Sequence, residues 1–313
     1  MPDIVVMFFL LGLVAGIVRS DLSVPKAAYD VLSLLLMLTI GLKGGFALHG
    51  QLRMSLIPEL LGVIAIGALI PIVLMPILRR LVRLSIADSA SLAAHYGSVS
   101  AGTFAVALAY AQTQLLDVGP EVTLYLVMLE LPAIIVAILL YRRAQPSVNG
   151  TLAGVWHEAL TNRGVILLVG GVVIGFMYGP NQGANVTGLL MGAFQVVLAL
   201  FLLDMGLTAA STLRPIPLQH WRLLTFALVA PPILAMVGLL MGTWLALPIG
   251  SIVILASMTA SASYIAAPAA IRNSIPDANI GLAMLAALGL TFPLNVILGI
   301  PLYHQIALAL QSV

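Results

Sequence analysis

Long runs of apolar residues follow one another along almost the whole chain, with short polar stretches between them. A helix needs roughly 17–25 such residues to cross the hydrocarbon core of a membrane. The longest charge-free run, from Leu223 to Ile271, holds 49 residues, and the turn signal LPIGS at 247–251 divides it in two. The pattern predicts ten spans, at about 3–18, 27–48, 55–78, 88–112, 122–141, 164–180, 186–210, 221–246, 250–271 and 279–308.

The second half of the chain repeats the first. Three segments return in the same order, 161–165 residues later. MLTIGLKGG (37–45) returns as LLDMGLTAA (202–210), HYGSVSAGTFAVALAYAQ (95–112) as SMTASASYIAAPAAIRNS (257–274), and ELPAIIVAILLYRRA (130–144) as TFPLNVILGIPLYHQIA (291–307). Conserved order and spacing indicate one internal duplication.

Five spans in each half would place the second copy upside down relative to the first. Inverted repeats of this kind are typical of secondary transporters, which bind substrate near the midplane between the repeats. We therefore predict an all-α polytopic membrane protein of ten transmembrane helices in a 5+5 inverted repeat. Its predicted parts are a first five-span repeat at 1–145, a cytoplasmic linker at 146–163 and a second, inverted repeat at 164–313.

Composition excludes a soluble domain. Charged residues make up 8% of the 313 positions and hydrophobic residues 61%, with a mean hydropathy of +1.14, whereas soluble chains average about 25% charged residues. The absence of cysteine excludes disulfides and thiolate metal sites. We find no ATPase motif and no dinucleotide or nucleic-acid signature, so the sequence predicts energy from an ion gradient or downhill flow and no organic cofactor.

Basic residues are divided unequally between the two sides of the predicted membrane. Of the 13 lysines and arginines, eleven fall in the odd-numbered connections and two, Lys43 and Arg53, in the even-numbered ones. Because cytoplasmic loops carry the excess of lysine and arginine, the odd connections should be cytoplasmic and both termini outside. We expect a multi-pass protein of a bacterial plasma (inner) membrane.

Spans four and nine lose their apolar character in the middle. Span four contains GSVSAGT at 97–103, and span nine contains SMTASASYIAAPAA at 257–270. Small residues and helix breakers free backbone amides, which bind anions, and carbonyls, which together with hydroxyls can ligate sodium. Close packing of helices is the alternative explanation for one such stretch. Two stretches at matching positions of the repeats favour broken helices and a binding site.

Two acidic residues lie inside predicted spans. Glu130 stands two positions before Pro132 near the middle of span five, and its repeat counterpart is Thr291. A carboxylate at that depth is costly unless paired or hydrated, so we predict a sodium ligand or a proton-coupling group, with a structural acid as the alternative. Asp204 is about two turns from the cytoplasmic end of span seven, so a functional role and a side chain that reaches water are both open for it. His95 lies near Ser98, but the sequence SVSAG at 98–102 lacks the first glycine of the G-x-S-x-G elbow of a hydrolase. We therefore predict that the protein is not an enzyme.

Four motifs together resemble the SbtA-type sodium-dependent bicarbonate transporters. They are IGLKGG (40–45), GSVSAGT followed by AVAL (97–108), Glu130-Leu131-Pro132 and IPDAN (275–279). The resemblance implies a homotrimer and a cytoplasmic regulator related to PII signalling proteins. It also implies that substrate is bound by Gly97, Ser98, Ser100, Thr103, Thr259, Ser261 and Ser263. It implies that sodium is held by Glu130, Ser100, Thr103 and Ser263.

The chain departs from that family's pattern in three places. Tyr264 replaces an aspartate after the serine-rich stretch, Glu130 replaces an aspartate of the cyanobacterial members, and the long hydrophilic central loop is missing. The function we expect is secondary active transport of a small anion, as sodium-dependent bicarbonate uptake. The alternatives are a proton- or sodium-coupled transporter of another small organic anion, or sodium/proton exchange, with Glu130 titrating. A further alternative is a non-transporting membrane scaffold or receptor.

Overall fold

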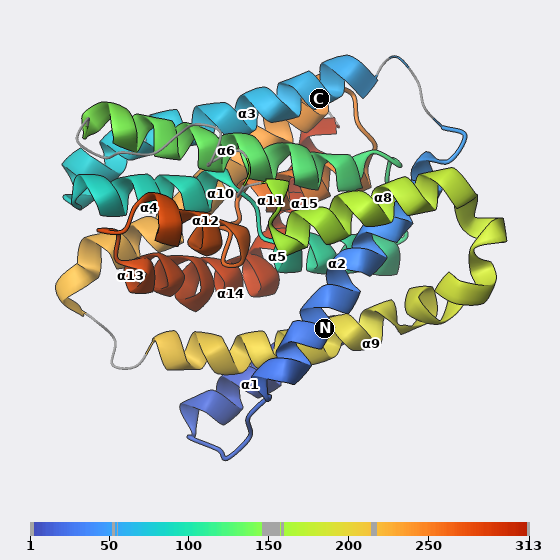
Figure 1. Ribbon diagram of the computed structural model, residues 1–313, viewed down its shortest axis with the longest axis horizontal. Coiled ribbons are helices and arrows are strands. Elements are labelled where there is room, and N and C mark those ends of the chain that lie inside the picture. Colours follow the sequence, from blue (N-terminus) through green and yellow to red (C-terminus); the bar gives the residue numbers. More distant parts are fainter. Residues whose placement is uncertain are drawn as a thin grey trace.

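The computed structural model describes residues 3–51, 54, 56–145, 157, 160–213 and 218–311, and in this part of the chain the regular elements are all helices (Figure 1). The α-helices are α1 (Ile4–Ile17), α2 (Lys26–Leu48), α3 (Leu56–Ile77), α4 (Ile86–Gly97), α5 (Ala101–Thr113), α6 (Val122–Ala144), α8 (Arg163–Gln182), α9 (Ala184–Thr212), α10 (Trp221–Trp244), α11 (Ile249–Thr259), α12 (Ala266–Ser274), α13 (Ile280–Met284), α14 (Phe292–Leu294) and α15 (Ile300–Gln311). Short 3-10 or π-helical segments join several of them: η1 (Leu78–Val82), η2 (Leu218–His220), η3 (Leu285–Thr291) and η4 (Asn295–Gly299). Most of the predicted linker lies outside the described residues, and its last residue, Arg163, begins α8.

Eight helical runs in the described residues are long and apolar enough to cross a membrane. They correspond to the second to eighth and the tenth predicted spans. The first and ninth correspond to shorter apolar helices, α1 with 14 residues and α11 with 11. At 1.5 Å per residue these helices rise only about 21 and about 16 Å, short of the roughly 30 Å of a hydrocarbon core. The structure is therefore that of a multi-pass membrane protein with eight full-length candidate spans.

Glycines allow two helix pairs from opposite halves of the chain to pack at very short distance. In the α2–α8 pair, a Cβ atom on Gly171 would lie 2.9 Å from the Leu38 carbonyl oxygen and 3.0 Å from the Gly41 Cα atom. In the α1–α9 pair, a Cβ atom on Gly206 would lie 2.6 Å from the Leu13 amide nitrogen. Small residues are what permits such close backbone approach in membranes. Gly41 and Gly206 occupy the same position in the matching segments 37–45 and 202–210, and both make such a close contact.

The other helices form a second group that holds the buried centre of the molecule. In the first half, α3, α4 and α6 pack on one another, and in the second half α10, α11 and the C-terminal run from η3 to α15 do the same. Short helices then cross between the halves, because α5 packs on α11 and α12 packs on α4. Figure 1 shows α4 and α12 between α6 and the run from α13 to α14. The helix Ile86–Thr113, broken inside, is the most buried of the candidate spans.

Candidate functional site

Both predicted breaks are present, and each is closed by a serine side chain. Span four stops at Gly97 and resumes at Ala101, where the Ser100 hydroxyl accepts a hydrogen bond from the Thr103 amide at 3.0 Å. Span nine stops at Thr259 and resumes at Ala266, where the Ser263 hydroxyl accepts from the Ala267 amide at 3.2 Å. A hydroxyl is a favourable cap because the first amides of a helix have no partner within it. Ser100 is therefore the cap of α5, and Ser263 is the hydrogen-bond partner of the second amide of α12.

The two breaks are hydrogen-bonded to each other. The Ser100 amide donates to the Ser261 hydroxyl at 2.9 Å, and that hydroxyl donates to the Met258 carbonyl at 2.7 Å. In the reverse direction the Ser263 amide donates to the His95 carbonyl at 2.7 Å. Backbone groups freed by the breaks thus find partners across the crossing, as buried backbone at membrane depth must. The Asn295 amide group adds a bond of 2.8 Å to the freed Ala260 carbonyl.

A small cavity lies beside this crossing. It has a volume of about 10 Å³, and its polar lining includes Ser100, Glu130, Ser263 and Tyr264. That volume is near the minimum of roughly 10–15 Å³ that holds one water molecule. The cavity is therefore sized for a single water molecule or a monatomic ion, with one carboxylate and two serine hydroxyl groups in its wall.

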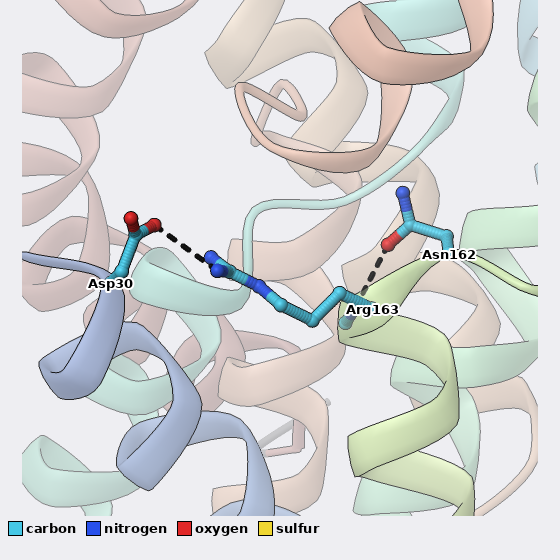
Figure 2. Close-up of polar contacts among 4 residues, drawn as sticks. Asp30, Asn162 and Arg163 are labelled. Atoms are coloured by element: carbon cyan, nitrogen blue, oxygen red, sulfur yellow. Dashed lines mark hydrogen bonds and ion pairs between the residues drawn. The ribbon is translucent and has the colours of Figure 1, made fainter. Parts of the chain in front are cut away.

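The helix α8 also begins at this cavity. Asn162 and Gly164 belong to the lining, and the Asn162 side chain accepts a hydrogen bond from the Gly164 amide at 2.9 Å. Figure 2 shows the intervening Arg163 extending away from Asn162 to Asp30, which it reaches at 3.1 Å. Side chains of this pair are 50% and 39% exposed. The pair thus joins the starts of α2 and α8 next to the cavity, in a position that solvent reaches.

Tyr264 fills the space above the first turn of α5. Its ring meets Phe292 edge-on, with 5.5 Å between the ring centroids. Its hydroxyl lies beside the Ser100 side chain and the Gly102 backbone, and a Cβ atom on Gly102 would collide with that hydroxyl. Tyr264 is therefore part of the cavity wall, and Gly102 is the position that makes room for it.

The remaining predicted residues differ in where their side chains point. Ser98 and Thr103 are fully buried, and their hydroxyls have no hydrogen-bond partner among the described residues. Thr259 instead bonds to carbonyls of its own helix and packs on Gly238 of α10. A Cβ atom on Gly97 would lie 2.8 Å from Pro71 and 2.9 Å from Ala133. The structure thus gathers Ser100, Ser263 and Glu130 at the cavity, leaves Ser98 and Thr103 unpartnered nearby in the chain, and directs Gly97 and Thr259 towards helix packing.

Glu130 has no acidic counterpart in the second half of the chain. Thr291, the repeat counterpart of Glu130, donates to the Ala227 carbonyl at 2.9 Å and lies 2.7 Å from the Tyr96 hydroxyl. Three polar or small residues near the crossing, Asn162, Gly164 and Asn295, were not predicted from the sequence. Asn162 has a helix-capping signal, and Asn295 is a lone amide in an apolar run, so both carry a local signal without an indication of their neighbours.

The donors at the cavity are oxygens, the ligands that hard cations prefer. In the part of the chain that the structure describes, no group of three or more histidine, cysteine, aspartate or glutamate side chains is arranged to hold a metal ion. A monovalent cation needs no such cluster, since one carboxylate with hydroxyl and carbonyl oxygens can complete its shell.

Two comparisons bear on the chain as a whole. The model of the Na+-dependent bicarbonate transporter superfamily matches residues 4–308. No curated protein sequence matches the chain. The match covers the crossing, the cavity and both helix groups.

Proposed function

The chain belongs to the Na+-dependent bicarbonate transporter superfamily, a family of transporters and not of enzymes, and from this premise we propose that it is a sodium-coupled symporter for bicarbonate. One observation carries the proposal. The two broken spans meet, and beside their crossing Ser100, Ser263 and Glu130 line one cavity of about 10 Å³. We assign sodium to this cavity, where the Glu130 carboxylate supplies the negative charge and the two hydroxyls supply further oxygens.

The anion would bind at the starts of α5 and α12. The first amides of a helix and its dipole attract negative charge, and both helices start inside the buried centre. The unpartnered hydroxyls of Ser98 and Thr103 add donors for bicarbonate oxygens. Sodium bound beside Glu130 reduces the negative charge that the anion must approach, which gives a physical reason for coupled binding. The predicted contributions of Gly97 and Thr259 would be indirect, through the packing of the crossing.

We further propose the ten-span inverted repeat. It is supported by the paired contacts, since α2 with α8 mirrors α9 with α1, and α5 with α11 mirrors α12 with α4. The orientation with both termini outside a bacterial plasma membrane rests on the eleven basic residues in the odd connections. A homotrimer and a PII-like cytoplasmic regulator are proposed from the resemblance of the motifs.

Proton coupling is the second candidate function, and it is favoured by the carboxylate in the cavity wall. Glu130 is the one ionisable carboxylate among the lining residues of that cavity. A carboxylate that takes up and releases a proton there would couple anion flow to a proton gradient instead of a sodium gradient. This version predicts that transport by Glu130→Gln loses its dependence on pH, whereas sodium coupling predicts the loss of its dependence on sodium.

The decisive experiment is uptake of labelled bicarbonate into proteoliposomes under an imposed sodium gradient, with a potassium gradient of the same size as the control. We expect uptake with sodium only, and less uptake by Ser100→Ala. The matched control is Ser257→Ala, because the Ser257 hydroxyl is fully buried but bonds to the Val253 carbonyl of its own helix at 2.7 Å. Equal uptake in both gradients by folded protein would exclude sodium coupling. Thermal unfolding unaffected by sodium, with no uptake, would indicate a non-transporting scaffold, because a ligand bound only to the folded state raises its stability.

A further inference from the structure

A groove outside the cavity at the crossing combines an apolar floor with a basic end. It lies between the end of α3, with η1, and the start of α10, and has a volume of about 670 Å³. Apolar side chains line most of its length, and several are widely exposed, among them Val73 at 48%, Val229 at 49% and Ile233 at 60%. Three arginines, Arg80, Arg83 and Arg222, gather at one end.

The basic end is shaped by an unusual helix terminus. The helix α3 ends in the π-helical turn η1, and Arg83 follows it in the left-handed conformation with φ of 64°. The Leu84 amide closes the terminus by donating to the Leu78 carbonyl at 3.2 Å. A residue other than glycine adopts this conformation at a cost and only when its surroundings hold it there. The turn reverses the chain directly at the groove and leaves the Arg83 side chain exposed.

These positive charges are not neutralised within the described chain. No carboxylate among the described residues forms an ion pair with Arg80, Arg83 or Arg222. The Arg222 guanidinium lies over the ring of Trp221, 5.3 Å from its centroid, and Trp221 is itself 59% exposed. Tryptophan is enriched at the level of lipid headgroups, and guanidinium groups bind phosphate through paired hydrogen bonds. The apolar floor, the tryptophan and the arginines that can donate hydrogen bonds to phosphate thus follow one another in the same order as the acyl chains, the interface and the phosphate of a lipid.

We propose that this groove is a binding site for an anionic phospholipid. One acyl chain lies along Val73, Val229 and Ile233, and the phosphate lies between the three arginines, with Trp221 at the boundary. The arginines fall in odd-numbered connections, the side that the excess of basic residues predicts to be cytoplasmic. Basic pockets between helices on that side of a membrane are suited to anionic headgroups. The groove and the cavity at the crossing share no lining residue.

The test uses the fluorescence of Trp221 in the full chain. In a Trp156→Phe/Trp244→Phe background only Trp221 emits, and a lipid with brominated acyl chains quenches it on contact. We expect brominated phosphatidylglycerol to quench at lower concentration than brominated phosphatidylcholine. Replacement of one groove arginine, as in Arg83→Gln, should weaken phosphatidylglycerol binding about fivefold, the equivalent of about 1 kcal/mol per basic residue. The control Arg143→Gln removes an exposed charge from the same side, outside the groove, and should have no effect.

Four outcomes would overturn the proposal. The first is equal quenching by the two lipids. The second is that Arg83→Gln and Arg143→Gln weaken the binding of phosphatidylglycerol equally. The third concerns the occupant. Val229→Phe fills the groove without adding a second tryptophan, and it should abolish quenching by either lipid while leaving the oligomeric state unchanged. If that variant instead dissociates an oligomer, the groove is a subunit interface. Inorganic phosphate should not displace the lipid, because it has no acyl chain, and displacement at millimolar concentration would identify a free-anion site.

Discussion

Two serines at the crossing should respond to alanine replacement with opposite changes in stability. The Ser98 hydroxyl is buried without a partner among the described residues, whereas the Ser261 hydroxyl both accepts from the Ser100 amide and donates to the Met258 carbonyl. An unsatisfied buried polar group costs about 1–3 kcal/mol, and removing one partner of a buried bond costs a similar amount. Ser98→Ala should therefore raise the unfolding free energy of the ligand-free protein by about 1 kcal/mol or more, and Ser261→Ala should lower it by about 1–3 kcal/mol.

The affinity for bicarbonate should not change in the same direction as the stability of the ligand-free protein. If the Ser98 hydroxyl donates to the anion, its loss removes a hydrogen bond to a charged group, which is worth about 1.5–3 kcal/mol, or about 10- to 150-fold in affinity. Ser98→Ala would then be more stable than the parent protein without ligand and less stabilised by bicarbonate. Such a combination is expected of a group held for a ligand and not for packing.

The stability of the ligand-free protein and its affinity for bicarbonate can be measured in one assay. Purified protein is unfolded by heat in micelles, without ligand and then over a series of bicarbonate concentrations at constant sodium. Ser257→Ala serves as control, since its hydroxyl bonds within its own helix. Ser98→Ala that retains full bicarbonate affinity would refute the assignment of the anion to this residue. A destabilisation by Ser98→Ala as large as that by Ser261→Ala would show that Ser98 has a structural partner.

Three further changes test other parts of the site. Glu130→Gln keeps the size of the side chain but removes the charge at the cavity, so sodium should no longer raise the thermal stability; unchanged stabilisation by sodium would place the ion elsewhere. Gly102→Ala should abolish uptake because its Cβ atom meets the Tyr264 hydroxyl, and Tyr264→Phe in the same chain should restore uptake in part; no rescue would mean that the clash is with Phe201 or Phe292. Gly171→Leu should prevent α2 and α8 from packing and abolish folded protein on size-exclusion chromatography, whereas Gly170→Leu, with open space at its Cβ position, should behave as the parent.

The breaks in spans four and nine were predictable because their cause is local. Glycine, serine and threonine in the middle of an apolar run weaken the helix and provide caps, and the structure places Ser100 and Ser263 at the first residue before each second half-helix or close to it. Glu130 could be singled out from the sequence because an ionised carboxylate inside an apolar segment is costly unless it is paired or hydrated. Each of these signals lies within a few residues of the chain.

Directions of side chains were not predictable in the same way. Thr259 and Gly97 belong to the same polar stretches as the cavity residues, yet they face α10 and the α3–α6 pair. The presence of Asn162 at the cavity depends on where α8 begins relative to α5, which no short motif encodes.

The glycine contacts of α2 with α8 and of α1 with α9 have a consequence for biogenesis. A ribosome completes α1 and α2 more than a hundred residues before it begins α8 and α9. Until then the surfaces around Gly12 and Gly41 face lipid or the insertion machinery, without the backbone that later lies against them. The first half therefore enters the membrane incomplete, and its assembly ends only when the second half arrives. Separately expressed halves should be unstable alone and should associate when they are made together.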